Sequence, residues 1–195
     1  TAAFPPLLNP PPDSQPPAGT LYSADGSVVG AENHPLHDGA LPPKSRLILS
    51  SEDIEPIFGT SPWEGPALLE VQGSEQFSLV TKLISPSGLV SNTNCVTKEQ
   101  VHNVLGYDGT DLSYIRFINL GDHALPKITG TVFDGEGNTV GATESVIVNS
   151  LPPKSHAWVS RDQLSDSIGS TWNGTASLKL SSSPADLRLL NLNLV

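Results

Sequence analysis

The chain has 195 residues, of which 37% are hydrophobic and 15% are charged, and its formal net charge is −10. With 20 acidic and ten basic residues and no cluster of lysine and arginine, the composition excludes nucleic acid binding and disfavours binding to an anionic membrane surface. No apolar run approaches the roughly 18 residues that a membrane-spanning helix needs. Eighteen prolines and 17 glycines predict many turns and few long helices.

The ends and the cysteine content suggest where the chain works. It contains no methionine, it begins Thr1-Ala2-Ala3, and Cys95 is its single cysteine, which excludes an intrachain disulfide framework. Removal of a secretory signal peptide can leave such a start. We expect an extracellular or cell-surface protein after signal-peptide removal, or a piece of a longer chain.

An internal repeat organises the sequence. The pentapeptide LPPKS occurs at 41–45 and again at 151–155. Longer stretches align in the same way, namely 19–31 with 130–142, 41–59 with 151–169, and 62–71 with 171–180. The alignment predicts a tandem duplication, with one unit at 1–96 and the other at 106–195. A proline-rich, apolar arm at 1–17 opens the first unit.

The segment between the units carries helix signals. Thr97 and Gln100 form a capping pattern, and Val101 and Leu105 have i, i+4 spacing. We therefore expect a short helical linker at 97–105.

Each unit is predicted to contain short strands and one helical turn. In the second unit, residues 113–119 alternate as a strand, and two strands pair as a hairpin around the Gly-Glu-Gly-Asn turn at 135–138. Ser160 begins a helical turn, as Ser50 does in the first unit. Residues 175–181 and 186–195 close the second unit as strands. The sequence thus predicts an all-β fold of two tandem antiparallel β-sandwich domains.

These elements also carry a resemblance. The order SYIRFIN, GTVFDGEGN, LPPKS with VSRDQL, and W-x-G-x-x-x-L-x-L resembles tandem, immunoglobulin-like β-sandwich repeats of about 100 residues in secreted and surface bacterial proteins. The resemblance covers nearly the whole chain, twice. It implies a fold and a location, and it brings no catalytic residue and no cofactor.

Two clusters have the residue types of metal sites. Asp134, Glu136 and Asn138 place oxygen ligands at alternate positions, as a calcium loop does, but the aligned segment 23–27 has one acid, so a hairpin turn is the favoured interpretation. His34 and His37 could bind zinc, but Pro35 prevents a helical pair and no further ligands follow. We favour a solvated loop there and predict no metal and no cofactor.

Aromatic residues are the candidates for binding a glycan. Trp63 and Trp172 align between the units, so they are expected to cover the sandwich as a plug in its core or at its rim. Trp158 aligns with Ile48, and it is a candidate for stacking on sugar together with Tyr114 or Tyr107. We find no signature of an enzyme, because G-x-S-x-G is absent and the paired acids at Glu52 and Asp53 fit a helix cap.

The units differ at their ends, and this difference suggests a function. The first unit runs on through a turn and a strand at 85–96, whereas the second stops at Val195, so it is predicted to lack its last strand. An unpaired sheet edge can accept another chain, and the extended arm could supply a donor strand. We predict a non-enzymatic structural protein, a self-assembling bacterial surface filament or matrix subunit joined head-to-tail. The contact residues expected are Phe4, Leu7, Leu8, Leu187, Leu189, Leu192 and Leu194.

Two alternatives stay open. The chain could be a glycan-binding or spacer module of a larger secreted hydrolase, with polysaccharide or the neighbouring domains of a longer chain as its partners. In that case the missing strand would lie beyond Val195, and the arm at 1–17 would be an interdomain linker.

Overall fold

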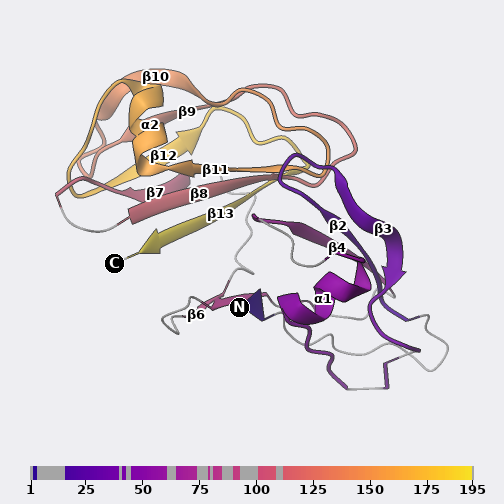
Figure 1. The fold of residues 1–195 in the computed structure, drawn as a ribbon. Coiled ribbons are helices and arrows are strands. Elements are labelled where there is room, and N and C mark those ends of the chain that lie inside the picture. The colour runs from indigo at the N-terminus through magenta and orange to yellow at the C-terminus, as the bar shows by residue number, and fades with distance from the viewer. Residues whose placement is uncertain are drawn as a thin grey trace. The chain divides into compact units, whose positions relative to one another are not determined.

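A computed structural model describes residues 2–3, 16–39, 41–42, 45–60, 65–73, 79, 81–84, 90–92, 101–108 and 112–194. The chain divides into two compact units, Thr1–Cys95 (unit 1) and Val96–Val195 (unit 2). In the described residues, both units consist of antiparallel strands with one short helix each (Figure 1). The expected all-β, sandwich-like fold is confirmed.

Unit 2 is a sandwich of two sheets. The four-stranded sheet has the order β10-β9-β12-β7, and the three-stranded sheet has the order β11-β8-β13. The strands are β7 (Val101–Leu105), β8 (Leu112–Asn119), β9 (Ile128–Phe133), β10 (Thr139–Val148), β11 (His156–Ser160), β12 (Thr175–Leu180) and β13 (Leu187–Leu194). Helix α2 (Arg161–Ile168) follows β11 directly and contacts β10, β11 and β8.

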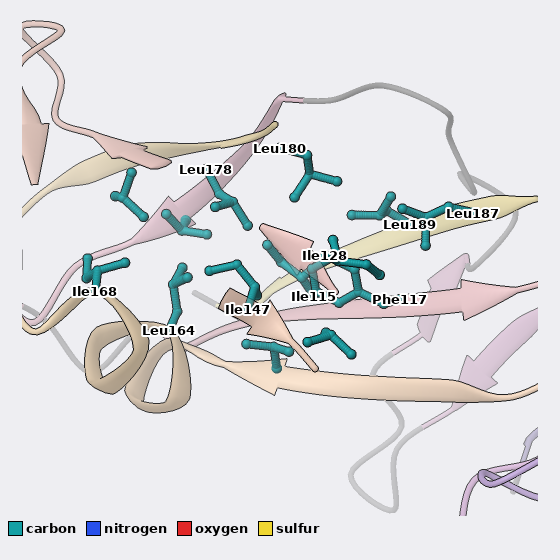
Figure 2. Packing of buried hydrophobic residues seen from close by; sticks show 14 of the residues in the cluster. Ile115, Phe117, Ile128, Ile147, Leu164, Ile168, Leu178, Leu180, Leu187 and Leu189 are labelled. Atoms are coloured by element: carbon teal, nitrogen blue, oxygen red, sulfur yellow. The ribbon is translucent and has the colours of Figure 1, made fainter. Parts of the chain in front are cut away.

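The core of unit 2 lies between the two sheets. Alternate residues of each strand face inward, because successive side chains of a strand point to opposite faces. Phe117 and Leu189 of the three-stranded sheet and Leu178 of the other sheet are fully buried. Figure 2 shows these side chains directed into one cluster, to which α2 contributes Leu164 and Ile168.

Unit 1 also has two described sheets. Their orders are β3-β2-β4 and β1-β5-β6. The elements are β1 (Ala2–Ala3), β2 (Ala18–Tyr22), β3 (Val28–Pro35), α1 (Ser51–Ile57), β4 (Leu68–Gln72), β5 (Lys82–Ile84) and β6 (Val90–Asn92). Leu21, Leu36, Ile54 and Phe58 form a buried cluster. Helix α1 thus contributes a buried side chain, Ile54, to this core, as α2 contributes Leu164 and Ile168 to the core of unit 2.

Residues that the internal repeat aligns have equivalent strand partners in the two units. Thr20 lies opposite Glu70 in β2–β4, and the aligned Thr131 lies opposite Lys179 in β9–β12. The Thr20 hydroxyl accepts the Asn33 N–H at 2.9 Å, and the Thr131 hydroxyl accepts the Glu144 N–H at the same distance. Asn33 and Glu144 both have positive φ, 49° and 51°. The same irregularity of the hairpin therefore occurs in both units.

A glycine in each of these hairpins is required by a close backbone approach. Gly30 and Gly141 have φ of 76° and 68°. A Cβ atom would lie 1.9 Å from the carbonyl oxygen of Phe58 at the first position and 2.4 Å from that of Ile168 at the second. Both oxygens belong to the end of the unit's helix, so no larger residue fits where the hairpin crosses it.

The second LPPKS segment forms a turn whose first and last residues, Leu151 and Ser155, are buried. Leu151 bridges to Leu125, and both side chains are buried. Asn119, which is fully buried at the end of β8, donates from its side-chain amide to the carbonyl oxygens of Leu151 and Pro152 at 3.1 and 2.8 Å. The pentapeptide in unit 2 is thus a structural element that satisfies a buried amide.

The predicted helical linker at 97–105 is wrong over its second half. Residues 101–105 form β7, which pairs with β12 at the edge of the four-stranded sheet. His102 and Val104 are buried, whereas Val101 and Asn103 are exposed. This alternation has the period of a strand, and it outweighs the i, i+4 spacing of Val101 and Leu105 because pairing with β12 buries one face only. Residues 97–100 lie outside the described ranges.

Candidate functional site

Strand β13 has an open edge among the residues that the structure describes. Its eight residues pair with β8 on one side only. The Leu120 N–H donates to the Asp186 carbonyl oxygen at 3.0 Å in the same register. Because hydrogen-bonded positions alternate in an antiparallel pair, bonds to β8 fall on even-numbered β13 residues. The N–H and C=O groups of Leu189, Asn191 and Asn193 therefore point away from β8.

The corresponding strand of unit 1 has two neighbours. Strand β5 pairs with β1 through Ala2–Leu83 and Ala3–Lys82, as β13 pairs with β8. On its other side, β5 pairs with β6 through Lys82–Asn92 and the two following positions. No described strand of unit 2 takes the place that β6 has in unit 1. The open edge of β13 is therefore one of the differences between the described sheets of the two units.

The β13 side chains divide between the two faces of the sheet. Leu187 and Leu189, predicted as contact residues, are 0% exposed and belong to the core, so their side chains cannot contact another chain in this fold. Leu192 is half-buried and lies on the opposite face. Phe4, Leu7 and Leu8, and the side chain of Leu194, lie outside the described residues. A contact along β13 thus rests on its backbone and its outer face.

Two asparagines on the inward face of β13 were not predicted. The Asn191 side chain donates to the Asn103 carbonyl oxygen of β7 at 2.5 Å. Asn193 accepts a hydrogen bond from the Ser113 hydroxyl at 2.6 Å, and that hydroxyl accepts the Leu105 N–H. These bonds link the edges of the two sheets where the apolar core ends. The alternation of Asn with Leu in LNLNL is the sequence signal that could have placed them.

The candidate sugar-stacking residues lie together on the outer face of the three-stranded sheet. Trp158 lies opposite Arg116 in the β11–β8 register, and its ring meets that of Tyr114 edge to face at 6.5 Å. The Arg116 guanidinium lies over the Trp158 ring, 5.6 Å from its centroid, and burial lowers its pKa to about 10. All three side chains are half-buried. Trp158 is therefore already engaged on its face by a cation, which makes it a poor platform for a sugar.

The third aromatic candidate, Tyr107, is part of a structural cluster. Its hydroxyl donates to Asp162 at 2.7 Å, and the Arg161 guanidinium lies 4.1 Å from its ring centroid. Burial, followed by the bond to Asp162, raises the pKa of the Tyr107 hydroxyl. Its ring also meets that of Trp172 at 5.9 Å, and Trp172 is buried as predicted, with its indole N–H donating to Val104. Trp63 lies outside the described residues.

The candidate calcium ligands form a hairpin turn. The Asp134 carboxylate accepts the N–H groups of Glu136 and Asn138 at 3.0 and 2.8 Å, and Asn138 also donates from its side chain. These bonds, with that of Asn138 first, lower the pKa of Asp134. In the aligned turn, bonds led by the Ser23 hydroxyl lower the pKa of Asp25 to about 2. Both acids are engaged by their own turns, as the hairpin interpretation requires.

The histidines also bond locally. His34 Nδ1 contacts the Pro35 carbonyl oxygen, and His37 Nδ1 contacts that of Gly39, both at 3.1 Å. Within the described ranges, no three His, Cys, Asp or Glu side chains are grouped as metal ligands would be. Cys95 lies outside those ranges.

A further cavity was not predicted. It lies on the outer face of the four-stranded sheet, has a volume of about 440 Å³, and is lined by Thr131, Phe133, Glu144, Lys179, Leu180 and Ser181. The residues come from the adjacent strands β10, β9 and β12 and from the residue that follows β12, so their proximity depends on strand register. Spacing along the chain gives no signal for it.

Comparison with known proteins adds no identity, because no family model, curated protein or solved structure matches the chain. Neither helix of the described ranges has the length and apolar composition needed to cross a bilayer.

Proposed function

We propose that this protein is a non-enzymatic, extracellular structural protein whose copies join head-to-tail by backbone pairing along β13. The open edge of β13 is the single observation that carries the proposal. An edge strand presents a row of unsatisfied N–H and C=O groups, and an extended segment of another chain can satisfy them by extending the sheet. This edge is eight residues long, so it offers several N–H and C=O groups to an added strand.

The donor in this proposal is the arm at 1–17 of the next copy. By the internal alignment, residues 6–9 correspond to the end of β8, and Ala2–Ala3 pair with β5 within unit 1. Donation to another copy is therefore an exchange, in which the arm leaves its own sheet. Proline-rich segments suit an edge position, because a residue without an N–H is tolerated where one side of the strand is unpaired.

The hydrogen bonds of several acidic side chains support the non-enzymatic part of the proposal. Two acids from the candidate clusters accept hydrogen bonds within the fold, Asp134 in a hairpin turn and Asp53 in a helix cap. Asp162 likewise accepts a hydrogen bond from Tyr107. The net charge of −10 and the single cysteine are compatible with an exported chain.

A matched pair of variants tests the proposal. Asn191→Pro removes an outward N–H from the middle of the edge, whereas Asn191→Ala loses the same side-chain bond to Asn103 and keeps the N–H. Sedimentation velocity at increasing concentration, with negative-stain electron microscopy, should reveal assemblies for the wild type and for Asn191→Ala. Asn191→Pro should stay monomeric. A wild type that stays monomeric throughout, or a proline variant that assembles equally well, contradicts the proposal.

A further inference from the structure

The cavity on the outer face of the four-stranded sheet of unit 2 has a defined chemical layout. Thr131 lies directly opposite Lys179 on the neighbouring strand, and on its other side its hydroxyl accepts the Glu144 N–H. Since neighbouring strands are about 4.8 Å apart, the acid and the base are attached about 10 Å apart, on either side of a small threonine. Phe133 follows two residues after Thr131, so it stands on the same face beside this gap.

The polar groups of the cavity are available to a ligand. Glu144, Lys179 and Ser181 are exposed, and no ion pair within the described ranges joins Glu144 to Lys179. An exposed carboxylate, an ammonium group and a hydroxyl thus surround a space beside a half-buried aromatic ring. The volume of about 440 Å³ lies within the usual range of about 300–1,000 Å³ for small-molecule sites.

In unit 1, the two residues that align with Phe133 and Lys179 are hydrogen-bonded to each other. Phe133 corresponds to Tyr22 and Lys179 to Glu70, and the strand registers agree. The Tyr22 hydroxyl donates to Glu70 Oε2 at 3.1 Å, across β2 and β4. In unit 2 the hydroxyl is missing and the acid is replaced by a base. These two replacements together remove the internal hydrogen bond and leave both side chains to face the cavity.

We propose that this cavity binds a neutral saccharide. A sugar presents an apolar C–H face that packs against an aromatic ring, and its hydroxyls can both donate to Glu144 and accept from Lys179. Acid and base in one site suit an uncharged polyol, which needs acceptors and donors together. The net charge of −10 disfavours a polyanionic ligand. The site lies on the sheet that does not contain β13, so the inference is independent of the proposed assembly.

The direct test uses amide chemical shifts of the full chain, titrated separately with cellotetraose, maltotetraose and N-acetylchitotetraose. At least one of them should shift the signals of Glu144, Lys179 and Ser181 and leave those of unit 1 unchanged. The double variant Phe133→Tyr/Lys179→Glu installs the pair that unit 1 already accommodates, so it should fold. It should weaken binding by at least about tenfold, which corresponds to about 1.4 kcal/mol.

Lys127→Glu is the matched control, because it makes the same change of charge at an exposed position outside the cavity and should leave binding unchanged. The proposal is overturned if none of the tetrasaccharides shifts these signals, or if the double variant binds as well as the wild type. It is also overturned if inorganic phosphate alone shifts them, which would make Lys179 an anion site.

Discussion

Units 1 and 2 share their hairpin turns, their helix caps and the order of three strands, β3-β2-β4 and β10-β9-β12, and differ in the strands at their edges. Beside β5, unit 1 has β6, for which unit 2 has no described counterpart. Beside β12, unit 2 has β7, for which unit 1 has no described counterpart next to β4. Interior positions are fixed by neighbours on all sides, so both units keep them. Edge positions determine which further strand can pair, and the described parts of the two units differ there.

The largest expected effect concerns the helix that closes each core. Ile54 and Leu164 occupy aligned positions and are 0% and 1% exposed. Replacing either by alanine should lower the free energy of unfolding of its own unit by about 2–5 kcal/mol. Calorimetry of the whole chain should show one transition moving for Ile54→Ala and the other for Leu164→Ala. If both variants shift the same single transition, the units do not unfold independently.

The next effect separates steric contact from backbone strain. Gly141→Ala brings a Cβ against the Ile168 carbonyl oxygen at positive φ, whereas Gly169→Ala has a similar φ of 70° and no atom within 4 Å. Strain alone costs about 1–2 kcal/mol, and the contact at Gly141 should raise the cost clearly above that. Urea unfolding measures both free energies. Equal losses for the two variants would mean that the hairpin moves away from the helix easily.

The smallest expected effect is at the helix caps. Ser50 and Ser160 each form a reciprocal capping box, with Asp53 and Gln163 as partners. Removing either hydroxyl with alanine should cost about 1 kcal/mol in the corresponding unit at neutral pH. Chemical unfolding of the two variants measures it, and a loss in only one unit would contradict the equivalence of the caps.

The stability of the two helix caps should respond differently to a fall in pH. Hydrogen bonds from the Ser50 hydroxyl and N–H lower the pKa of Asp53 below its ordinary value of 3.8. The group therefore contributes stability above its unfolded pKa, and this stability is lost as the pH falls through the lower folded pKa. Gln163 has no charge to lose. Asp53→Asn should flatten the acid dependence of unit 1, and an unchanged pH profile would show that this cap makes no such contribution.

Parts of the fold could be predicted from the sequence where residue types at short, fixed spacing determine the local structure. The hairpin turns at Asp25 and Asp134, the caps at Ser50 and Ser160, and the burial of Trp172 follow from residue types at fixed spacing. The turns and the caps depend on neighbours within a few residues of the chain. The burial of Trp172 depends on distant partners such as Val104, but its alignment with Trp63 in the repeat indicated it.

The predictions from sequence were wrong where the structure of a segment depends on partners that are distant in the chain. Residues 101–105 form a strand because β12 lies beside them, and Leu187 and Leu189 are core residues because β13 faces the other sheet. The cavity between Glu144 and Lys179 needs the register of three strands, which no local pattern contains. Periodicity indicated that β13 is a strand, but it could not indicate which of its faces and edges is covered.

Amide hydrogen exchange along β13, resolved by NMR, tests the central claim most directly. In dilute solution the amides of Leu190 and Leu192, which bond to β8, should be protected, and those of Asn191 and Asn193 should exchange fast. At concentrations where copies associate, Asn191 and Asn193 should become protected as well. Protection of Asn191 and Asn193 already in the dilute monomer would contradict the account, because the edge of β13 would then be paired within a single chain.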